Sequence, residues 1–380
     1  MSARLEACGH QIIHLFLENE TSQSTKPVKS HHNLPPSYGL IAGQLLRRKL
    51  RGILLKARPD LIHVHECFTT LSSVLLTDMR DFAPLVGTLH DVRPFCYLMT
   101  RRFTPSGEIC LRQCGASCFF SGCIRPDGLA DAVRLTRRWM TDRLSLNEWR
   151  RLDRVIVPST YMYELALQHG ILQKHLRLVP HGTSVSPSPP SAESRTEPAL
   201  LLYVGSLLDY KGPGILVEAL SLIREQHWHA ALVGEGPLRK SLEEAVMRLH
   251  LSERVTFYGH VSDGNEVRKL LGSARLLVVP SLIPESFSLA GIEALAMGTP
   301  VVSFGLGGIR EWFRDGENGL LSRLGDATDL ARQISRLIAD RELAKELGKT
   351  GHALIADNFS TENALNGLLG VYGELHGKTT

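Results

Sequence analysis

In the second half of the chain, short apolar runs rich in branched side chains alternate with segments that are long enough to form helices. The runs occupy residues 199–205, 229–234, 254–259, 274–280 and 299–304. This alternation predicts parallel strands that are joined by helices on both faces of one sheet. The first half repeats the pattern less regularly, with strand candidates at 9–17, 60–66, 83–91, 153–159 and 175–182. The chain is therefore expected to be an α/β protein with two parallel-sheet domains.

A stretch crowded with proline and serine, SVSPSPPSAESRTEP at residues 184–198, separates the two halves. Loss of hydrophobic periodicity together with this composition is typical of a linker. We therefore predict an N-terminal domain over 1–183, a C-terminal domain over 199–357, and a last helix over 358–380 that packs back on the N-terminal domain. Amphipathic segments predict the helices of the first half near 40–57, 129–151 and 160–169.

Glycine and serine follow the predicted strands of the second half, at the sheet edge where α/β proteins bind ligands. These strand exits cover residues 205–212, 234–237, 280–287 and 305–308. Glycine lets a backbone approach a ligand closely, and a helix start presents unpaired N–H groups to an anion. Any one exit alone is explained as a tight connection between a strand and a helix. Together they favour a diphosphate as the ligand.

Two glutamates bracket a predicted helix start in the segment PESFSLAGIEALAMGTPVV, residues 284–302. Glu285 precedes the helix, Glu293 lies on it, and Ser286 or Ser288 would cap it. A carboxylate can accept two hydroxyl hydrogen bonds, so one acid would suit the ribose and the other the sugar of a nucleotide-sugar. The alternative is that both acids merely complement the helix dipole.

These segments resemble the motifs of the family 4 glycosyltransferases, which have the GT-B fold and transfer sugar from a nucleotide-sugar with retention of anomeric configuration. The matching motifs of the second half are YVGSLLDYKG, VGEGP, RVTFYGHV, the segment with the two glutamates, GGIRE and DGENGLL. Those of the first half are DLIHVHE, GTLHD, DRVIVPS and VPHG. The resemblance implies two Rossmann-like domains that face a cleft. It also implies a UDP- or GDP-sugar donor, held mainly by the C-terminal domain, and a glycan or lipid-linked acceptor.

The same resemblance assigns roles to individual residues. It places Glu285 on the donor sugar ring, Lys211 on the diphosphate and His90 across the cleft, and these three form the predicted catalytic set. Physical reasoning also supports Lys211, because an ammonium group stabilises the charge on a departing nucleoside diphosphate. The resemblance implies that Glu293 binds the ribose hydroxyls. The other predicted donor-binding residues are Gly205, Ser206, Gly234, Gly236, Ser286, Phe287, Ser288, Leu289, Gly307 and Gly308.

His90 and the metal question leave alternatives open. A histidine at the end of an apolar strand is also compatible with a structural role, and the neighbouring Asp91 would either orient His90 or cap the next turn. No Asp-x-Asp pair occurs in the sequence, so we expect no catalytic metal and no cofactor requirement.

Two departures from the family pattern bear on activity. Ser206 stands where the family has a second basic residue for the phosphates. The family's first strand and its glycine-rich loop are absent before Met1, so we expect an N-terminal domain that lacks its first strand. Both departures leave open a donor-binding remnant or subunit without turnover. A nucleotide-sugar epimerase or hydrolase is a further alternative.

Five cysteines gather around a segment without regular periodicity that we interpret as an insertion over 96–123; they are Cys96, Cys110, Cys114, Cys118 and Cys123. Four thiolates at loop spacing could hold a structural Zn²⁺ ion, and buried thiols are the alternative. Similar cysteine-bearing insertions after the His-Asp pair occur in family members that make polysaccharides.

Basic segments rich in leucine at 45–56 and 134–151, the second with Trp139 and Trp149, are candidates for contact with an anionic membrane. The alternative is a solvated face of ordinary helices. No aromatic-stacking module accompanies the charge, so nucleic acid is not an expected partner. No apolar run approaches the roughly 18 residues of a membrane helix, and no secretory signal pattern opens the chain. We expect a cytoplasmic protein, attached to the inner face of the membrane if these segments bind lipid.

Overall fold

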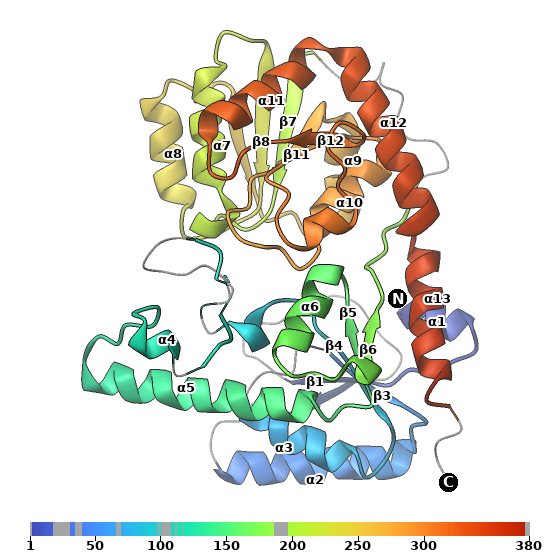
Figure 1. Cartoon of the computed structure of the whole chain (residues 1–380). Coiled ribbons are helices and arrows are strands. Elements are labelled where there is room, and N and C mark those ends of the chain that lie inside the picture. Colours follow the sequence, from blue (N-terminus) through green and yellow to red (C-terminus); the bar gives the residue numbers. More distant parts are fainter. Residues whose placement is uncertain are drawn as a thin grey trace.

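The computed structural model describes residues 2–17, 31–34, 40–65, 70–96, 98, 100, 108–110, 112–115, 117–185 and 197–376. Two α/β domains lie one above the other, and the C-terminal helices run from the upper domain down the side of the lower one (Figure 1). Each domain is built on a parallel sheet, as the sequence predicts.

The C-terminal domain contains a six-stranded parallel sheet in the order β12-β11-β10-β7-β8-β9. Its strands are β7 (Ala199–Val204), β8 (Trp228–Val233), β9 (Val255–Gly259), β10 (Leu276–Val279), β11 (Val301–Ser303) and β12 (Gly319–Leu321). The first five confirm the predicted strands, and β12 adds a sixth that was not predicted. The chain runs outward from β7 to β9 and then crosses to β10 on the other side of β7. The carboxyl ends of β7 and β10 therefore form the point where α/β sheets bind ligands.

Helices cover both faces of this sheet. Successive residues of a strand point to opposite faces, and Leu201 accordingly packs in one apolar cluster while Leu202 packs in another. This two-sided burial explains why the strands read as continuous apolar runs. The covering helices are α7 (Pro213–Leu222), α8 (Arg239–Arg248), α9 (Gly264–Ser273), α10 (Leu289–Ala296), α11 (Ala327–Ala339) and α12 (Arg341–Asn358).

The N-terminal domain contains a four-stranded parallel sheet in the order β3-β4-β5-β6. Its strands are β3 (Ile62–His65), β4 (Leu85–Thr88), β5 (Arg154–Val157) and β6 (Leu176–Leu178). A separate parallel pair joins β1 (His14–Leu17) to β2 (His31–Leu34). The strand predicted over 9–17 is therefore a strand only in its last four residues.

The helices of the N-terminal domain follow the amphipathic segments closely. The predicted helices correspond to α2 (Leu40–Ala57), α5 (Gly128–Trp149) and α6 (Thr160–Gln168), and the sequence missed α3 (Thr70–Met79). Two further short helices of the described residues are α1 (Ser2–Ala7) and α4 (Ser117–Phe120). In Figure 1, α5 extends sideways beyond the sheet, and α4 lies beside its free end.

The last helix, α13 (Thr361–Gly373), packs against the N-terminal sheet. Leu365, Leu368 and Val371 of this helix share an apolar cluster with Val86 of β4 and Ile156 of β5. At the junction between α12 and α13, the backbone of Thr183 donates a hydrogen bond to the carbonyl of Phe359 at 2.9 Å. The two domains are thus connected by a second chain crossing besides the linker.

Candidate active site

An ion pair lies where the exits of β7 and β10 meet. The ammonium group of Lys211, in the 3-10 turn Asp209–Lys211, lies 2.7 Å and 2.8 Å from the two carboxylate oxygens of Glu285. The hydroxyl of Ser281 also donates a hydrogen bond to this carboxylate. The side chains of Lys211 and Glu285 are only 28% and 12% exposed. Two of the three predicted catalytic residues are therefore in direct contact.

Glycine at position 212 makes this contact possible. Gly212 has a φ of 73°, and a Cβ there would lie 1.9 Å from the carbonyl oxygen of Pro280. Backbones this close admit only glycine. Gly212 thus brings the turn that carries Lys211 against the loop that carries Glu285.

The predicted glycines of the β8 exit also serve close packing. Gly234 has a φ of 136°, and a Cβ there would lie 2.0 Å from the carbonyl oxygen of Gly205. At Gly236 a Cβ would meet the carbonyl of Leu207 at 2.5 Å. These three glycines hold the exits of β7 and β8 together.

The loop after β11 is bonded to the backbone beside Glu285. The amide of Gly308 donates to the carbonyl of Glu285 at 2.7 Å, and Gly307 has a φ of 63°. A Cβ on Gly308 would lie 2.0 Å from the carbonyl oxygen of Ser286. The structure therefore places both predicted glycines next to the acid that is predicted to hold the donor sugar.

The start of α10 differs from the prediction. Ser288 occupies the N-cap position, but within the described residues its side chain makes no capping hydrogen bond, and Ser286 does not occupy that position. The predicted position of the cap at Ser288 is therefore confirmed, but the expected hydrogen bond from its side chain is not made. The reason is the backbone of Ser288, whose φ of 66° is the left-handed conformation that non-glycine residues rarely adopt. Among the described residues, the Ser288 side chain leaves the N–H groups of the first turn uncapped, and such groups suit an anion.

Phe287 and Leu289, which flank Ser288, have opposite environments. The side chain of Phe287 is buried, and its carbonyl accepts a hydrogen bond from the indole of Trp312 at 2.6 Å. Leu289 is about half exposed. A bound donor would therefore meet the backbone of Phe287 and not its ring.

Glu293 lies one turn into α10 and is half-buried. In the part of the chain that the structure describes, it makes no hydrogen bond or ion pair. Burial raises the pKa of this carboxyl, and the charge of Arg268 acts against that rise. A partly desolvated carboxylate without a partner gains from hydroxyl donors, which fits the ribose role predicted for Glu293.

A row of histidine rings leads from the N-terminal sheet to the C-terminal domain. Nδ1 of His65 lies 2.8 Å from Nε2 of His90. The ring of His90 stacks parallel to that of His181 at 5.5 Å between centroids, and His181 contacts the edge of Phe287 at 5.4 Å. Burial, with the charges of His90 and His65 adding to it, lowers the pKa of His181 to about 4. The neutral ring of His181 therefore lies between His90 and Phe287, in the loop that carries Glu285.

Asp91 takes one of its two predicted roles. Its carboxylate accepts the backbone N–H of Arg93 at 2.8 Å and forms an ion pair with the Arg93 guanidinium at 2.6 Å. It therefore caps the turn after His90.

Sequence reasoning missed three residues that position the site. His181 is the third residue of the motif VPHG, and only the spatial meeting of the exits of β4 and β6 gives it a role. Ser159, which caps α6, donates its hydroxyl to the carbonyl of Ser286 at 2.6 Å. Glu311 accepts the backbone N–H of Thr160 at 2.8 Å. These polar contacts join the start of α6 to the donor-side loops, and the motifs DRVIVPS and GGIRE carried the signal for them.

The cysteine segment has its own small apolar cluster. Cys114 and Cys118 are half-buried and pack beside Leu135, Phe119 and Trp139. No group of three or more His, Cys, Asp or Glu side chains in the described ranges is arranged to hold a metal ion. The structural zinc stays a prediction.

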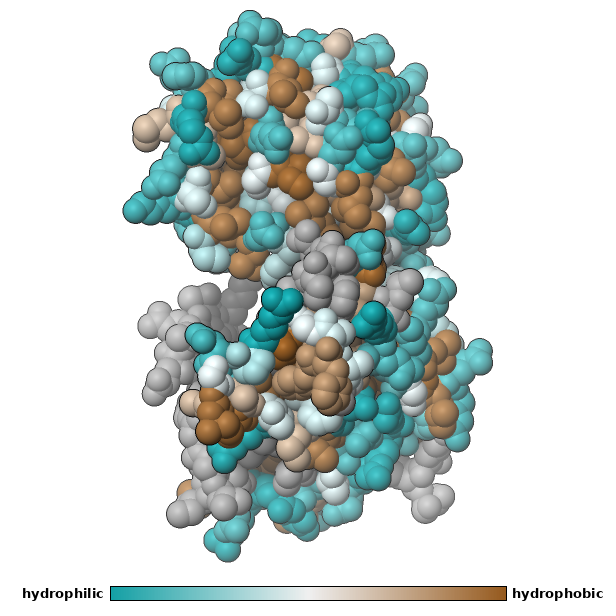
Figure 2. All heavy atoms as spheres, turned by 60° about the vertical axis from the view of Figure 1, so that its left-hand side comes forward, coloured by the Kyte–Doolittle hydropathy of each residue, from teal (hydrophilic) through white to brown (hydrophobic). Residues whose placement is uncertain are grey.

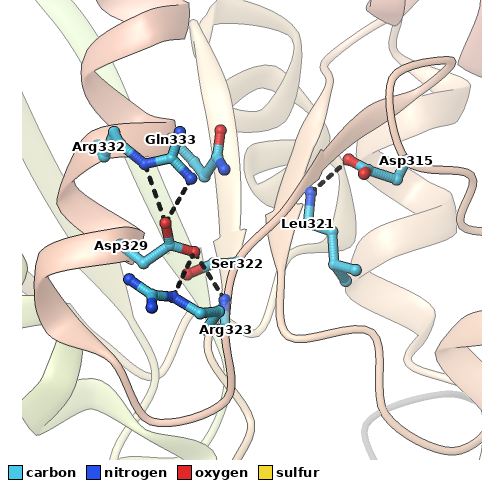
Figure 3. A pocket seen from close by; sticks show the side chains of 7 residues that line it. All are labelled: Asp315, Leu321, Ser322, Arg323, Asp329, Arg332 and Gln333. Carbon is cyan, nitrogen blue, oxygen red and sulfur yellow. Dashed lines mark hydrogen bonds and ion pairs between the residues drawn. The ribbon is translucent and has the colours of Figure 1, made fainter.

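A pocket of about 440 Å³ lies between the end of β12 and the start of α11 (Figure 3). Asp329 at its wall accepts hydrogen bonds from Arg332 and from the backbone of Arg323. These charges already pair with one another, and none of the predicted donor residues lines the pocket. We therefore place the candidate active site at the Lys211–Glu285 pair and not in this pocket.

Two stacked parallel-sheet domains, with the polar strand exits of one domain facing the other, define a GT-B protein. The family profile described as "Glycosyltransferase Family 4" matches residues 1–186, and the one described as "Glycosyl transferases group 1" matches residues 187–353. A D-inositol 3-phosphate glycosyltransferase of Acidothermus cellulolyticus is 31% identical over 389 residues, which cover 90% of this chain and 79% of that protein. The chain belongs to the family 4 glycosyltransferases, and the resemblance seen in the sequence motifs is confirmed.

Other similar proteins extend this comparison. Glycogen synthase of Mycobacterium tuberculosis is 27% identical, over 86% of this chain and 72% of that protein. An uncharacterized glycosyltransferase of Methanocaldococcus jannaschii is 35% identical over 174 residues, about half of each chain (46% and 48%). The Anabaena protein HepE, in a complex with UDP and glucose, has the same fold with a TM-score of 0.67 and 22% identity, over 91% of this chain and 86% of that one.

Described helices give no sign of a transmembrane segment, since none combines the length and the apolar character that crossing a bilayer requires.

Proposed function

We propose that this protein transfers a sugar from a UDP- or GDP-sugar to a glycan or lipid-linked acceptor, with retention of anomeric configuration. The observation that carries the proposal is the Lys211–Glu285 pair at the uncapped start of α10. The ammonium group of Lys211 and the carboxylate of Glu285 then lie next to the uncapped N–H groups of α10, and the carboxylate of Glu293 lies one turn further along that helix. A nucleotide-sugar presents a diphosphate between two groups that carry hydroxyls, and this order of groups matches the site.

In this proposal the diphosphate lies against the first turn of α10 and takes the ammonium group of Lys211 from Glu285. Glu285 then accepts hydroxyl hydrogen bonds from the donor sugar, while Glu293 accepts those of the ribose. As the bond between the sugar and the diphosphate breaks, negative charge grows on the leaving group. Lys211 and the N–H groups stabilise this charge without reorganising. Because they supply the positive field, the reaction is expected to proceed without a divalent metal.

The acceptor would enter between the two domains, on the side of His90. The histidine row places this ring at the exit of β4, facing the donor loops. Relatives support a glycan as one acceptor class, because glycogen synthase of Mycobacterium tuberculosis is among them. A hexose is the proposed type of donor sugar, since the complexed neighbour HepE holds glucose.

One specific feature favours a second candidate, a protein that binds the donor without turning it over. Ser206 supplies no positive charge at the position where the family has a basic residue, and its carbonyl accepts the hydroxyl of Tyr203 at 2.8 Å. The diphosphate would then depend on Lys211 and the backbone alone.

Purified protein mixed with UDP- and GDP-sugars, with and without glycan or lipid-linked acceptors, separates these functions. The proposed transferase releases nucleoside diphosphate only when the right acceptor is present, and it does so in EDTA. Donor binding that leads to no nucleotide release with any of the acceptors would favour the second candidate. Isomerised donor sugar in the absence of acceptor would contradict both.

A further inference from the structure

Helix α5 carries apolar side chains on two opposite sides. On one side Leu135, Leu146 and Trp149 are buried against the N-terminal domain. On the other side large apolar residues are exposed, namely Leu129, Val133, Met140 and Leu144. Their exposed fractions of 84%, 48%, 53% and 56% mean that no described part of the chain covers them. We call these four residues the α5 stripe.

The spacing of the stripe places it on a single face. Its members follow one another at intervals of four, seven and four positions. With 3.6 residues per turn, they fall within about 60° of one another around the helix axis. A helix that only covers its own domain needs one apolar face. The second face therefore indicates contact with something other than the described part of the chain.

Helix α4, which lies beside the free end of α5, adds a further exposed apolar side chain. Phe120, the last residue of α4, is 91% exposed. Phe119 holds α4 on α5 by an edge contact with Trp139 at 6.2 Å between centroids. Figure 2 brings this side of the molecule forward and shows brown patches among teal and white atoms on its lower half.

Arginines flank the stripe. Arg137 and Arg143 fall on either side of it at about 40° or less from its edges on the helical projection, and both side chains are exposed. Arg134 is exposed as well, and it pairs with Asp131. Arg143 also donates to the carbonyl of Cys114 at 2.9 Å, which fixes its direction. The border of the stripe is therefore mainly positive.

We propose that the α5 stripe docks the N-terminal domain on an anionic lipid bilayer. Leucine, valine and methionine side chains along one helical face suit the boundary between headgroups and acyl chains, and arginines on the flanks reach the headgroup phosphates. Each cation near such a surface adds attraction that salt weakens. A protein partner with an apolar groove would not require this positive border, and for that reason we assign the stripe to lipid.

The residues proposed here for lipid contact differ from those that the sequence made candidates. Trp139 and Trp149 belong to the segment that the sequence made a candidate for membrane contact, but Trp149 is fully buried and Trp139 is half-buried in the cluster beside α4. The other basic segment, 45–56, lies on α2. Its exposed Leu45 and Leu55 are ten positions apart, so they point in different directions around the helix and form no stripe.

Vesicle flotation of the full chain tests this proposal. The vesicles contain phosphatidylcholine alone or phosphatidylcholine with about 30% phosphatidylglycerol, a content that gives an anionic surface. The proposal predicts that the protein floats with the anionic vesicles and that high salt releases it. Replacing three stripe residues, Leu129→Ser, Met140→Ser and Leu144→Ser, should lower the bound fraction at least about tenfold, because each change removes inserted apolar surface. The matched control, Leu45→Ser with Leu55→Ser, removes exposed leucines outside the stripe and should change nothing.

Three results would overturn the proposal. The first is flotation that is equal with neutral and anionic vesicles. The second is flotation that the stripe variant leaves intact while it retains the wild-type circular dichroism spectrum. The third is a wild-type dimer in light scattering that the stripe variant converts to a monomer, because the stripe would then bind a second copy of this chain. The stripe residues are distant in sequence from the donor loops, so nucleotide binding by the stripe variant should equal that of the wild type and report on the donor site separately.

Discussion

Replacing Glu285 and replacing Lys211, each in a separate variant, should change the affinity for UDP in opposite directions. The carboxylate of Glu285 makes two short contacts with the ammonium group of Lys211, so a diphosphate has to compete with it for that group. UDP has the diphosphate and the ribose but lacks the donor sugar that is transferred, so it needs Lys211 and gains nothing from Glu285. Glu285→Gln should therefore free the ammonium group and tighten UDP binding, whereas Lys211→Ala should weaken it.

The magnitudes follow from the burial of the pair. An exposed ion pair contributes up to about 1 kcal/mol, whereas breaking a fully buried one costs about 3–5 kcal/mol. Because Lys211 and Glu285 are 28% and 12% exposed, we expect Lys211→Ala to lower the free energy of unfolding by about 2 kcal/mol. Loss of a charged hydrogen bond to the leaving diphosphate costs about 1.5–3 kcal/mol, which lowers kcat about 10- to 100-fold. Glu285→Gln should tighten UDP binding by up to about fivefold and still lower kcat.

Isothermal titration with UDP and an assay of acceptor-dependent nucleotide release measure these effects. Lys240→Ala, an exposed lysine on α8 of the same domain, is the matched control and should leave both quantities unchanged. The reasoning is refuted if Lys211→Ala binds UDP and turns over like the wild type. It is also refuted if Glu285→Gln weakens UDP binding as much as Lys211→Ala does.

Three further predictions concern other parts of the chain. Burial raises the pKa of Glu293 above the ordinary value of 4.5. As pH falls, the affinity for the donor should therefore begin to drop at a higher pH than it would with a glutamate of ordinary pKa. Titration calorimetry of Glu293→Gln should show an affinity that is about tenfold weaker and independent of pH in that range. The guanidinium of Arg177, together with Arg154, lowers the pKa of Glu374 to about 2. This pair therefore stabilises the fold above the unfolded glutamate pKa and is lost as pH falls towards 2, so acid titration of Glu374→Gln should show a weaker loss of stability between pH 4.5 and 2 than the wild type. If the cysteine segment binds zinc, protein purified without chelators should contain about one zinc ion per chain. Elemental analysis that finds no zinc would contradict this prediction.

Periodicity revealed the C-terminal domain because its strands are buried on both faces and read as unbroken apolar runs. The exception is β12 (Gly319–Leu321), in which only two leucines follow a glycine and the second leucine is exposed, so no unbroken apolar run marks it. In the N-terminal domain, β2 has the sequence HHNL, which carries no strand signal. Its pairing with β1 depends on neighbours in space that no local pattern encodes.

The candidate site was predicted where local chemistry sufficed and was missed where distant segments meet. Glu285 and Glu293 are visible from their spacing around one helix start. The contact between Lys211 and Glu285 depends on how closely Gly212 approaches Pro280, and these residues lie far apart in the sequence. The left-handed backbone of Ser288 is likewise imposed by its surroundings, so the rule that serine caps helices failed there.

Helix α5 illustrates a different limit. Its sequence carries enough apolar residues for two faces, and periodicity cannot tell which face the domain will bury. The sequence made the segment with Trp139 and Trp149 a candidate for membrane contact, yet the large apolar surface of Trp149 is buried in the core. The smaller apolar residues of the α5 stripe remain exposed on the surface. Only the packing of α5 against α3 and the sheet separates the two faces.

The most direct test of the account is a structure of the protein with UDP bound. We predict that the β-phosphate lies at the first turn of α10, within hydrogen-bond distance of the ammonium group of Lys211, and that the ribose hydroxyls meet the carboxylate of Glu293. A diphosphate bound elsewhere, with Lys211 still paired to Glu285 and no ligand near Glu293, would contradict it.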